Sequence, residues 1–130
     1  MDEKIRLSDS EWKIISELWS ESPRTITQLV SALKQSCNWS KSTVITLLNR
    51  MEAKGAVYYT EGRKARMYFP SATHEELVRS ETEEFIDKVY NGNAGLLLSA
   101  LVDSHSLSAD EISSLHSILS NAQKEKEEKK

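Results

Sequence analysis

The segment from Asn38 to Gly55, NWSKSTVITLLNRMEAKG, constrains the fold more than any other part of this 130-residue chain. Apolar residues recur in it at i, i+3, i+4 and i+7, and these are Val44, Leu47, Leu48 and Met51. This spacing is typical of a helix with one buried face. The opposite face carries Ser, Thr and Asn with almost no acid, whereas an ordinary surface helix carries Glu and Lys. We therefore predict a helix capped by Ser40 and ended by Gly55, whose exposed face does more than meet solvent.

Two further helices are predicted before this segment. The first lies in LSDSEWKIISELW, where Ser8 and Glu11 form a capping box, and it is expected to stop near Ser20. Its buried stripe is predicted to be Trp12, Ile15, Leu18 and Trp19. Residues 24–26 are then expected to form a short strand. Thr25 or Thr27 would cap the second helix, which runs to about residue 35.

After Gly55 the hydrophobic period changes from that of a helix to that of a strand. In AVYYTEGRKARMYFP, residues 57–60 and 67–69 alternate in polarity around a turn at residues 61–64, and Pro70 ends the run. This pattern predicts a β-hairpin. The order helix, short strand, helix, helix, hairpin is that of a winged helix-turn-helix. We predict a mainly α fold with a small β-wing, in which residues 1–72 form a winged-helix domain.

Residues 73–130 are predicted to form a second, helical domain that ends in a charged, frayed tail, KEKEEKK. A helix is expected over residues 73–90, another in LLLSALV, and a third that a capping box at Ser108 and Glu111 begins. This half holds more apolar side chains than a small lone subdomain can cover. We therefore expect a homodimer whose interface includes Phe85, Val89, Leu97, Leu98, Leu101, Ile112, Leu115 and Leu119.

The charge of the chain is unevenly distributed. The total is −3, which taken alone argues against nucleic acid. Residues 38–70, however, carry a net charge of +4, whereas residues 1–37 carry −1 and residues 71–130 carry −6. A basic region inside an acidic chain indicates that only this region approaches an anionic partner.

A helix-turn-helix recognition helix enters the major groove of DNA, where short polar side chains suit the base edges and acids would repel the phosphates. On a helical wheel Ser42, Thr46 and Asn49 lie opposite the apolar stripe. Double-stranded DNA is therefore the expected partner of this helix and of the basic wing. The predicted DNA-binding residues are Lys41, Ser42, Thr43, Ile45, Thr46, Asn49, Arg50, Arg63, Lys64 and Arg66.

These residues resemble a known family. WSKSTVITLLNRMEAKG, the wing that ends in YFP, and SDSEWKIISELW resemble the corresponding motifs of the BlaI/MecI/CopY family of bacterial repressors. The resemblance implies a homodimeric repressor that binds an operator dyad with inverted TACA/TGTA half-sites and blocks transcription. It assigns groove-facing positions to residues 42, 43, 45 and 46, and backbone contacts to Arg50 and the wing. Ser42 replaces a common lysine and Ile45 a frequent polar residue, and both departures bear on operator preference and affinity.

The resemblance also implies ways in which the repressor is released. In the penicillinase branch a sensor-activated protease cuts an Asn-Phe bond, which aligns with Ala100-Leu101. The Asn-Phe pair is absent, and the segment is explained more simply as dimer core. The copper branch uses Cys-x-Cys motifs, whereas this chain has the single cysteine Cys37, so we expect no copper site. The inducing signal stays open.

The sequence gives less support to other classes of function. The chain shows no nucleophile motif and no paired carboxylates, so we expect no enzyme, no catalytic residue, no metal site and no cofactor. No apolar run is long enough to span a bilayer and the N-terminus lacks a secretory signal, which predicts a cytoplasmic protein without membrane insertion. The alternative is a winged-helix protein-interaction module without sequence-specific DNA binding. The +4 region and the nearly acid-free helix face argue against that alternative.

Overall fold

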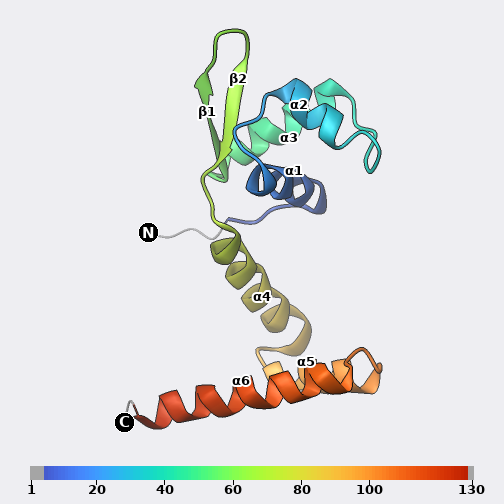
Figure 1. Ribbon diagram of the computed structural model, residues 1–130, viewed down its shortest axis with the longest axis vertical. Helices are drawn as coiled ribbons and strands as arrows, with labels where there is room; N and C mark the ends of the chain where they lie inside the picture. Colours follow the sequence, from blue (N-terminus) through green and yellow to red (C-terminus); the bar gives the residue numbers. More distant parts are fainter. Residues whose placement is uncertain (1–4, 129–130) are drawn as a thin grey trace. The chain divides into compact units, whose positions relative to one another are not determined.

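The computed structural model describes residues 5–128, so predictions for residues 1–4 and 129–130 lie outside the described part. The chain is mainly helical with one antiparallel pair of strands (Figure 1). It divides into two compact units, one through Glu83 and one from Glu84 onward. Among the described residues, no helix is long and apolar enough to cross a membrane.

Helix α1, Asp9–Ser20, begins at the predicted capping box. The Glu11 amide donates to Ser8 Oγ at 3.2 Å, and the Ser8 amide donates to Glu11 Oε1 at 2.8 Å. The predicted buried stripe is partly wrong. Ile14, Ile15 and Leu18 are buried, whereas both tryptophans are only half-buried. Trp12 and Trp19 instead meet edge to face at 5.6 Å, because the buried face of the helix is centred on Ile14, Ile15 and Leu18 and leaves both rings at its edge.

Helix α2, Ile26–Ala32, is capped by Thr25, one of the two predicted caps. It ends earlier than predicted, because the chain turns after Ala32 and the Lys34 amide donates three residues back to Ser31 O. The predicted strand at residues 24–26 is reduced to a single bridge between Arg24 and Tyr68. It cannot extend further because Thr25 already serves as the cap of the helix.

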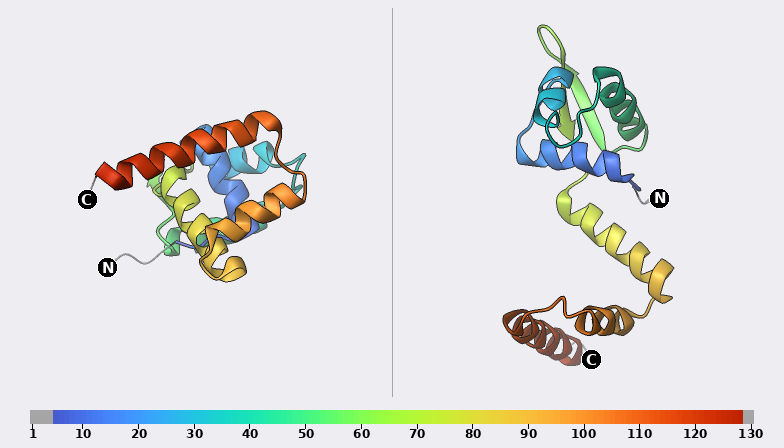
Figure 2. Two further views of the ribbon diagram at one scale, coloured as in Figure 1. Left: turned by 90° about the horizontal axis from the view of Figure 1, so that it is seen from below. Right: turned by 90° about the vertical axis from the view of Figure 1, so that its right-hand side faces the viewer.

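Helix α3, Lys41–Ala53, and the hairpin follow as predicted, and Figure 2 shows α1, α2 and α3 gathered beside the two strands. Ser40 is the N-cap, Gly55 has a φ of +83°, and all four stripe residues of α3 are buried. Strands β1, Val57–Glu61, and β2, Arg66–Pro70, pair with Val57 opposite Pro70 and Glu61 opposite Arg66. The turn therefore covers residues 62–65, one residue later than predicted, because Glu61 still pairs.

Three helices complete the chain as predicted: α4, His74–Tyr90; α5, Ala94–Asp103; and α6, Ala109–Glu128. The second capping box is present, since the Glu111 amide donates to Ser108 Oγ at 3.1 Å and the Ser108 amide to Glu111 Oε1 at 2.9 Å. The tail was predicted to fray, but the described part of it continues α6 to Glu128. Its alternating Glu and Lys residues suit an exposed helix.

The start of α4 is fastened to the unit that holds the wing. Ser71 Oγ donates to Gly55 O at 2.6 Å, Trp19 Nε1 donates to Ala72 O at 3.0 Å, and Leu77 is buried in the core. These contacts explain why the first compact unit extends into α4. The division into a DNA-binding domain and a dimerisation domain after residue 72 stays a prediction.

One ion pair with a buried carboxylate joins α1 to the end of α3. Lys54 Nζ donates to Glu11 Oε1 at 2.6 Å, and the Glu11 side chain is only 1% exposed. Burial by itself raises the pKa of Glu11, but hydrogen bonds from Lys54 and Ser8, with the charge of Lys54, outweigh it and lower the pKa below 4.5. The ionised carboxylate therefore stabilises the fold.

This depressed pKa predicts a dependence of stability on pH. A lowered folded-state pKa contributes stability above the unfolded value, and that contribution is lost as the pH falls through the folded-state pKa. We expect the difference in unfolding free energy between the wild type and Glu11→Gln to be largest near neutral pH and to shrink below pH 4.5. Urea unfolding across a pH series measures it, with the exposed Glu125→Gln as control. A difference that is independent of pH would contradict the role of Glu11.

Candidate nucleic-acid interface

The exposed side of α3 forms a continuous polar surface. Val44, Leu48 and Met51 are completely buried, which holds the helix against the core and turns its other side outward. Among the predicted DNA-binding residues on this helix, those that lie exposed are Lys41, Ser42, Thr43, Thr46, Asn49 and Arg50. An open depression of about 260 Å³ is lined by Ser42, Thr43, Thr46, Leu47 and Arg50. The structure thus brings four of the predicted residues together.

Hydroxyl groups at the start of α3 form a local network. Ser40 Oγ accepts from the Thr43 amide at 3.2 Å and lies 3.1 Å from both Ser42 Oγ and Thr43 Oγ1. Thr46 Oγ1 donates to Ser42 O at 3.0 Å. These bonds restrict the rotamers of short side chains, so the surface meets a ligand with little loss of conformational entropy.

Ile45 and Asn49 do not line the depression. Ile45 is half-buried, so only part of the side chain is available for the predicted contact with DNA. Asn49 is exposed one turn after Ile45, towards the C-terminal end of the helix. Both lie on α3, but contact of either with DNA stays a prediction.

The predicted wing cations differ in their surroundings. Arg63 and Lys64 lie exposed in the turn, and neither forms a salt bridge within residues 5–128. Arg66 lies on β2, with its guanidinium 4.1 Å from the centre of the Tyr59 ring and 3.6 Å from Glu61. A hydrogen bond with Tyr68 is the main cause that raises its pKa above the ordinary value. The tip therefore offers two uncommitted charges, whereas Arg66 also braces the hairpin.

Two structural contacts of the interface were missed by sequence reasoning. Lys54 entered the sequence analysis only through the net charge of residues 38–70, although it anchors the C-terminal end of α3 to Glu11. Arg24 donates to Glu17 at 2.8 Å, and its backbone exchanges two hydrogen bonds with Tyr68 on the wing. No spacing rule links residues so far apart in the sequence, so no local signal could have identified the first contact.

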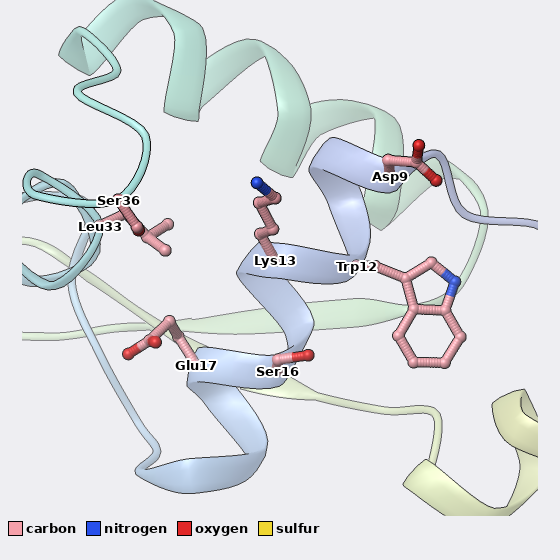
Figure 3. Close-up of a pocket in the computed structure, with 7 residues that line it drawn as sticks. All are labelled: Asp9, Trp12, Lys13, Ser16, Glu17, Leu33 and Ser36. Carbon is pink, nitrogen blue, oxygen red and sulfur yellow. The ribbon is translucent and has the colours of Figure 1, made fainter. Parts of the chain in front are cut away.

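A second depression, of about 440 Å³, lies between α1 and the end of α2. Figure 3 shows Lys13 and Glu17 on the side of α1 that faces Leu33 and Ser36, with the Trp12 ring on the other side of the helix. Its lining mixes both signs of charge, and Glu17 is already paired with Arg24. Nothing in this arrangement assembles a nucleophile with a base, and no group of three or more metal-ligating side chains occurs within residues 5–128.

The second unit leaves its apolar side chains only partly covered. Within the described part of α5 and α6 no residue is buried. Of the predicted interface residues, Phe85, Val89, Ile112 and Leu119 are 40 to 53% exposed. The others are half-buried, and Leu98, Leu101 and Leu115 help to line a groove of about 360 Å³. The Ala100-Leu101 bond lies inside α5, where the Ser104 amide donates to Ala100 O at 3.0 Å.

Comparison with known proteins agrees with this architecture. The family described as "Penicillinase repressor" matches residues 7–121. The penicillinase repressor of Bacillus licheniformis is 24% identical over 95% of this chain and 96% of its own length. The methicillin resistance regulatory protein MecI of Staphylococcus aureus is 28% identical over 92% of this chain and 98% of its own length. The solution structure of monomeric B. licheniformis BlaI in complex with the blaP half-operator has a TM-score of 0.50, with 24% identity, and covers 58% of this chain and 93% of the other.

Proposed function

Because the chain belongs to the penicillinase repressor family, we propose that it is a transcriptional repressor that binds operator DNA through α3 and the wing. The observation that carries this proposal is the nearly acid-free exposed face of α3, together with two uncommitted cations at the tip of the hairpin. A groove of DNA offers hydrogen-bonding base edges between two rows of phosphates, and this surface offers short polar side chains beside positive charges. No enzymatic activity is proposed.

Binding by a homodimer completes the proposal. The unit from Glu84 onward buries no residue of α5 or α6, so its apolar side chains need a cover that a second copy would supply. Two copies present two recognition helices, which match an operator with inverted half-sites. The net charge of −6 over residues 71–130 would keep this half away from the duplex. The site of action would be the cytoplasm, where the DNA of a bacterium lies.

Release by a protease, if it follows the penicillinase branch, would act on α5. The carbonyls of Ala100 and Leu101 both accept backbone hydrogen bonds, at 3.0 and 3.1 Å. A protease binds its substrate as an extended strand, so cleavage at this bond would require α5 to unwind first. We propose the bond only as the aligned position, since the Asn-Phe pair is absent.

The wing provides a quantitative test of the DNA proposal. Arg63→Ala and Lys64→Ala should each weaken binding by a similar factor on operator and scrambled duplexes, because a turn cation contacts phosphates rather than bases. Each should also reduce the slope of log K against log salt by about 0.9. Fluorescence anisotropy across a salt series measures both effects.

The matched control for the wing is Lys126→Ala, which removes a charge from exposed α6 and should change neither quantity. Equal effects of all three variants would mean that only net charge matters. An unchanged affinity in both wing variants would favour the alternative, a winged-helix interaction module without specific DNA binding.

A further inference from the structure

Thr46 differs from the other hydroxyl residues of α3 in one respect: the direction of its hydrogen bond is known. Its Oγ1 lies 3.0 Å from the carbonyl oxygen of Ser42, one turn earlier in the helix. A carbonyl oxygen only accepts hydrogen bonds, so the hydroxyl of Thr46 must be the donor. Its single proton points back to the helix, and the lone pairs of Oγ1 are all that remain for a ligand.

The hydroxyls of Ser42 and Thr43 can each donate or accept a hydrogen bond. Ser40 Oγ lies 3.1 Å from Ser42 Oγ and from Thr43 Oγ1, and in each pair either oxygen can be the donor. Ser42 and Thr43 can therefore meet donors or acceptors on a base edge. Thr46 can donate outward only by giving up its bond to Ser42 O, because a threonine hydroxyl has one proton.

We propose that Thr46 reads an exocyclic amino group in the major groove, which is adenine N6 or cytosine N4. This inference rests on the proposed function and extends it to a single atom of the operator. Guanine presents only the acceptors N7 and O6 in this groove and thymine presents O4, so neither satisfies an oxygen that can only accept. Thr46 is exposed, lines the depression together with Arg50, and lies on the face opposite the buried stripe. It therefore acts as a specificity-determining residue.

Two substitutions separate the hydroxyl from the shape of the side chain. Thr46→Val keeps the branched shape and a similar helix propensity but removes the oxygen. Thr46→Ser keeps the oxygen and loses the methyl group. We expect Thr46→Val to weaken binding to the operator about three- to tenfold, the size of one hydrogen bond, and to leave binding to a scrambled duplex unchanged. Thr46→Ser should retain most of the wild-type affinity. Equal affinities of Thr46→Val and the wild type for the operator would overturn the inference.

Base analogues then test the polarity of the contact. Each adenine of a half-site is replaced in turn by 2-aminopurine, which lacks the N6 amino group, and each cytosine by 2-pyrimidinone, which lacks the N4 amino group. At one position the analogue should weaken the wild type three- to tenfold and leave Thr46→Val unaffected. The control is 7-deazaadenine, which removes the N7 acceptor and keeps the amino group. On this duplex the affinity of Thr46→Val should fall below that of the wild type by the same factor as on the natural operator.

Different results would refute the proposed function and the role of Thr46. If the wild type does not prefer the operator over a scrambled duplex, the proposed function fails. The wild type can prefer the operator while Thr46→Val stays weaker than the wild type by the same factor on every analogue that lacks an amino group. That result would refute the contact with an amino group. If the wild type and Thr46→Val instead bind the 7-deazaadenine operator with equal affinity, Thr46 donates a hydrogen bond to N7, which is the opposite polarity.

Discussion

Replacing Leu119 by Asp is expected to give a monomer and to weaken binding to a dyad by about 10²- to 10⁴-fold. The Leu119 side chain is 53% exposed in the single chain and shares one face of α6 with Ile112, which is 40% exposed. A carboxylate placed there would have to be desolvated in a dimer interface, whereas in the monomer it stays in water. When two recognition helices are linked, the second binds as if at millimolar concentration, and that advantage is lost in a monomer.

The control for this variant is Ser117→Asp, which adds the same charge to an exposed position on the opposite face of α6. Sedimentation velocity should report a dimer for the wild type and Ser117→Asp, and a monomer for Leu119→Asp. Anisotropy on a single half-site should give similar affinities for all three proteins. A Leu119→Asp protein that stays dimeric and binds the dyad normally would show that the interface lies elsewhere.

Replacing Lys54 by Met is expected to destabilise the first unit by about 2 to 4 kcal/mol. The substitution leaves the Glu11 carboxylate, 1% exposed, without its cation, and breaking a buried pair by removing one partner costs about 3–5 kcal/mol. The expected loss is somewhat smaller because the Lys54 side chain is 38% exposed. For a unit of this size the loss corresponds to a fall in Tm of roughly 10 to 20 °C.

A double mutant distinguishes an unpaired charge from lost packing. Glu11→Gln combined with Lys54→Met removes both charges and keeps an amide that can accept from Ser8, so it should recover part of the stability that Lys54→Met loses. Thermal unfolding followed by circular dichroism measures all four proteins. A double mutant whose loss equals the sum of the single losses would show that the two residues do not interact.

Local signals were sufficient to predict most of the first unit. The N-caps Ser8 and Ser40 and the change of period after Gly55 each depend on residues a few positions apart, and all three are present. The prediction that Trp12 is buried was wrong because periodicity selects the face of a helix but not which large side chain fits a small core. Ile14, which the predicted stripe left out, is completely buried, whereas Trp12 packs against the core from its margin.

Contacts between distant parts of the chain could not be predicted in the same way. Lys54 and Glu11 are 43 residues apart, and only the folded chain brings them within 2.6 Å. Arg66 was predicted as a wing cation from its charge alone, but its position over the Tyr59 ring depends on the exact register of the hairpin. For the candidate interface, then, the face of α3 could be read from the sequence, whereas the attachments that hold it and the direction of the Thr46 hydrogen bond could not.

Sequence-specific binding of operator DNA is tested most directly by an equilibrium titration. The purified full-length protein is titrated by fluorescence anisotropy against a labelled duplex with inverted TACA/TGTA half-sites, which the family resemblance suggests, and against a scrambled duplex. We expect a large preference for the dyad, with log K falling by about 0.9 per log unit of salt for each phosphate neutralised. Weak and equal binding to both duplexes would contradict specificity for this dyad, and the absence of binding to either at low salt would contradict the DNA-binding function itself.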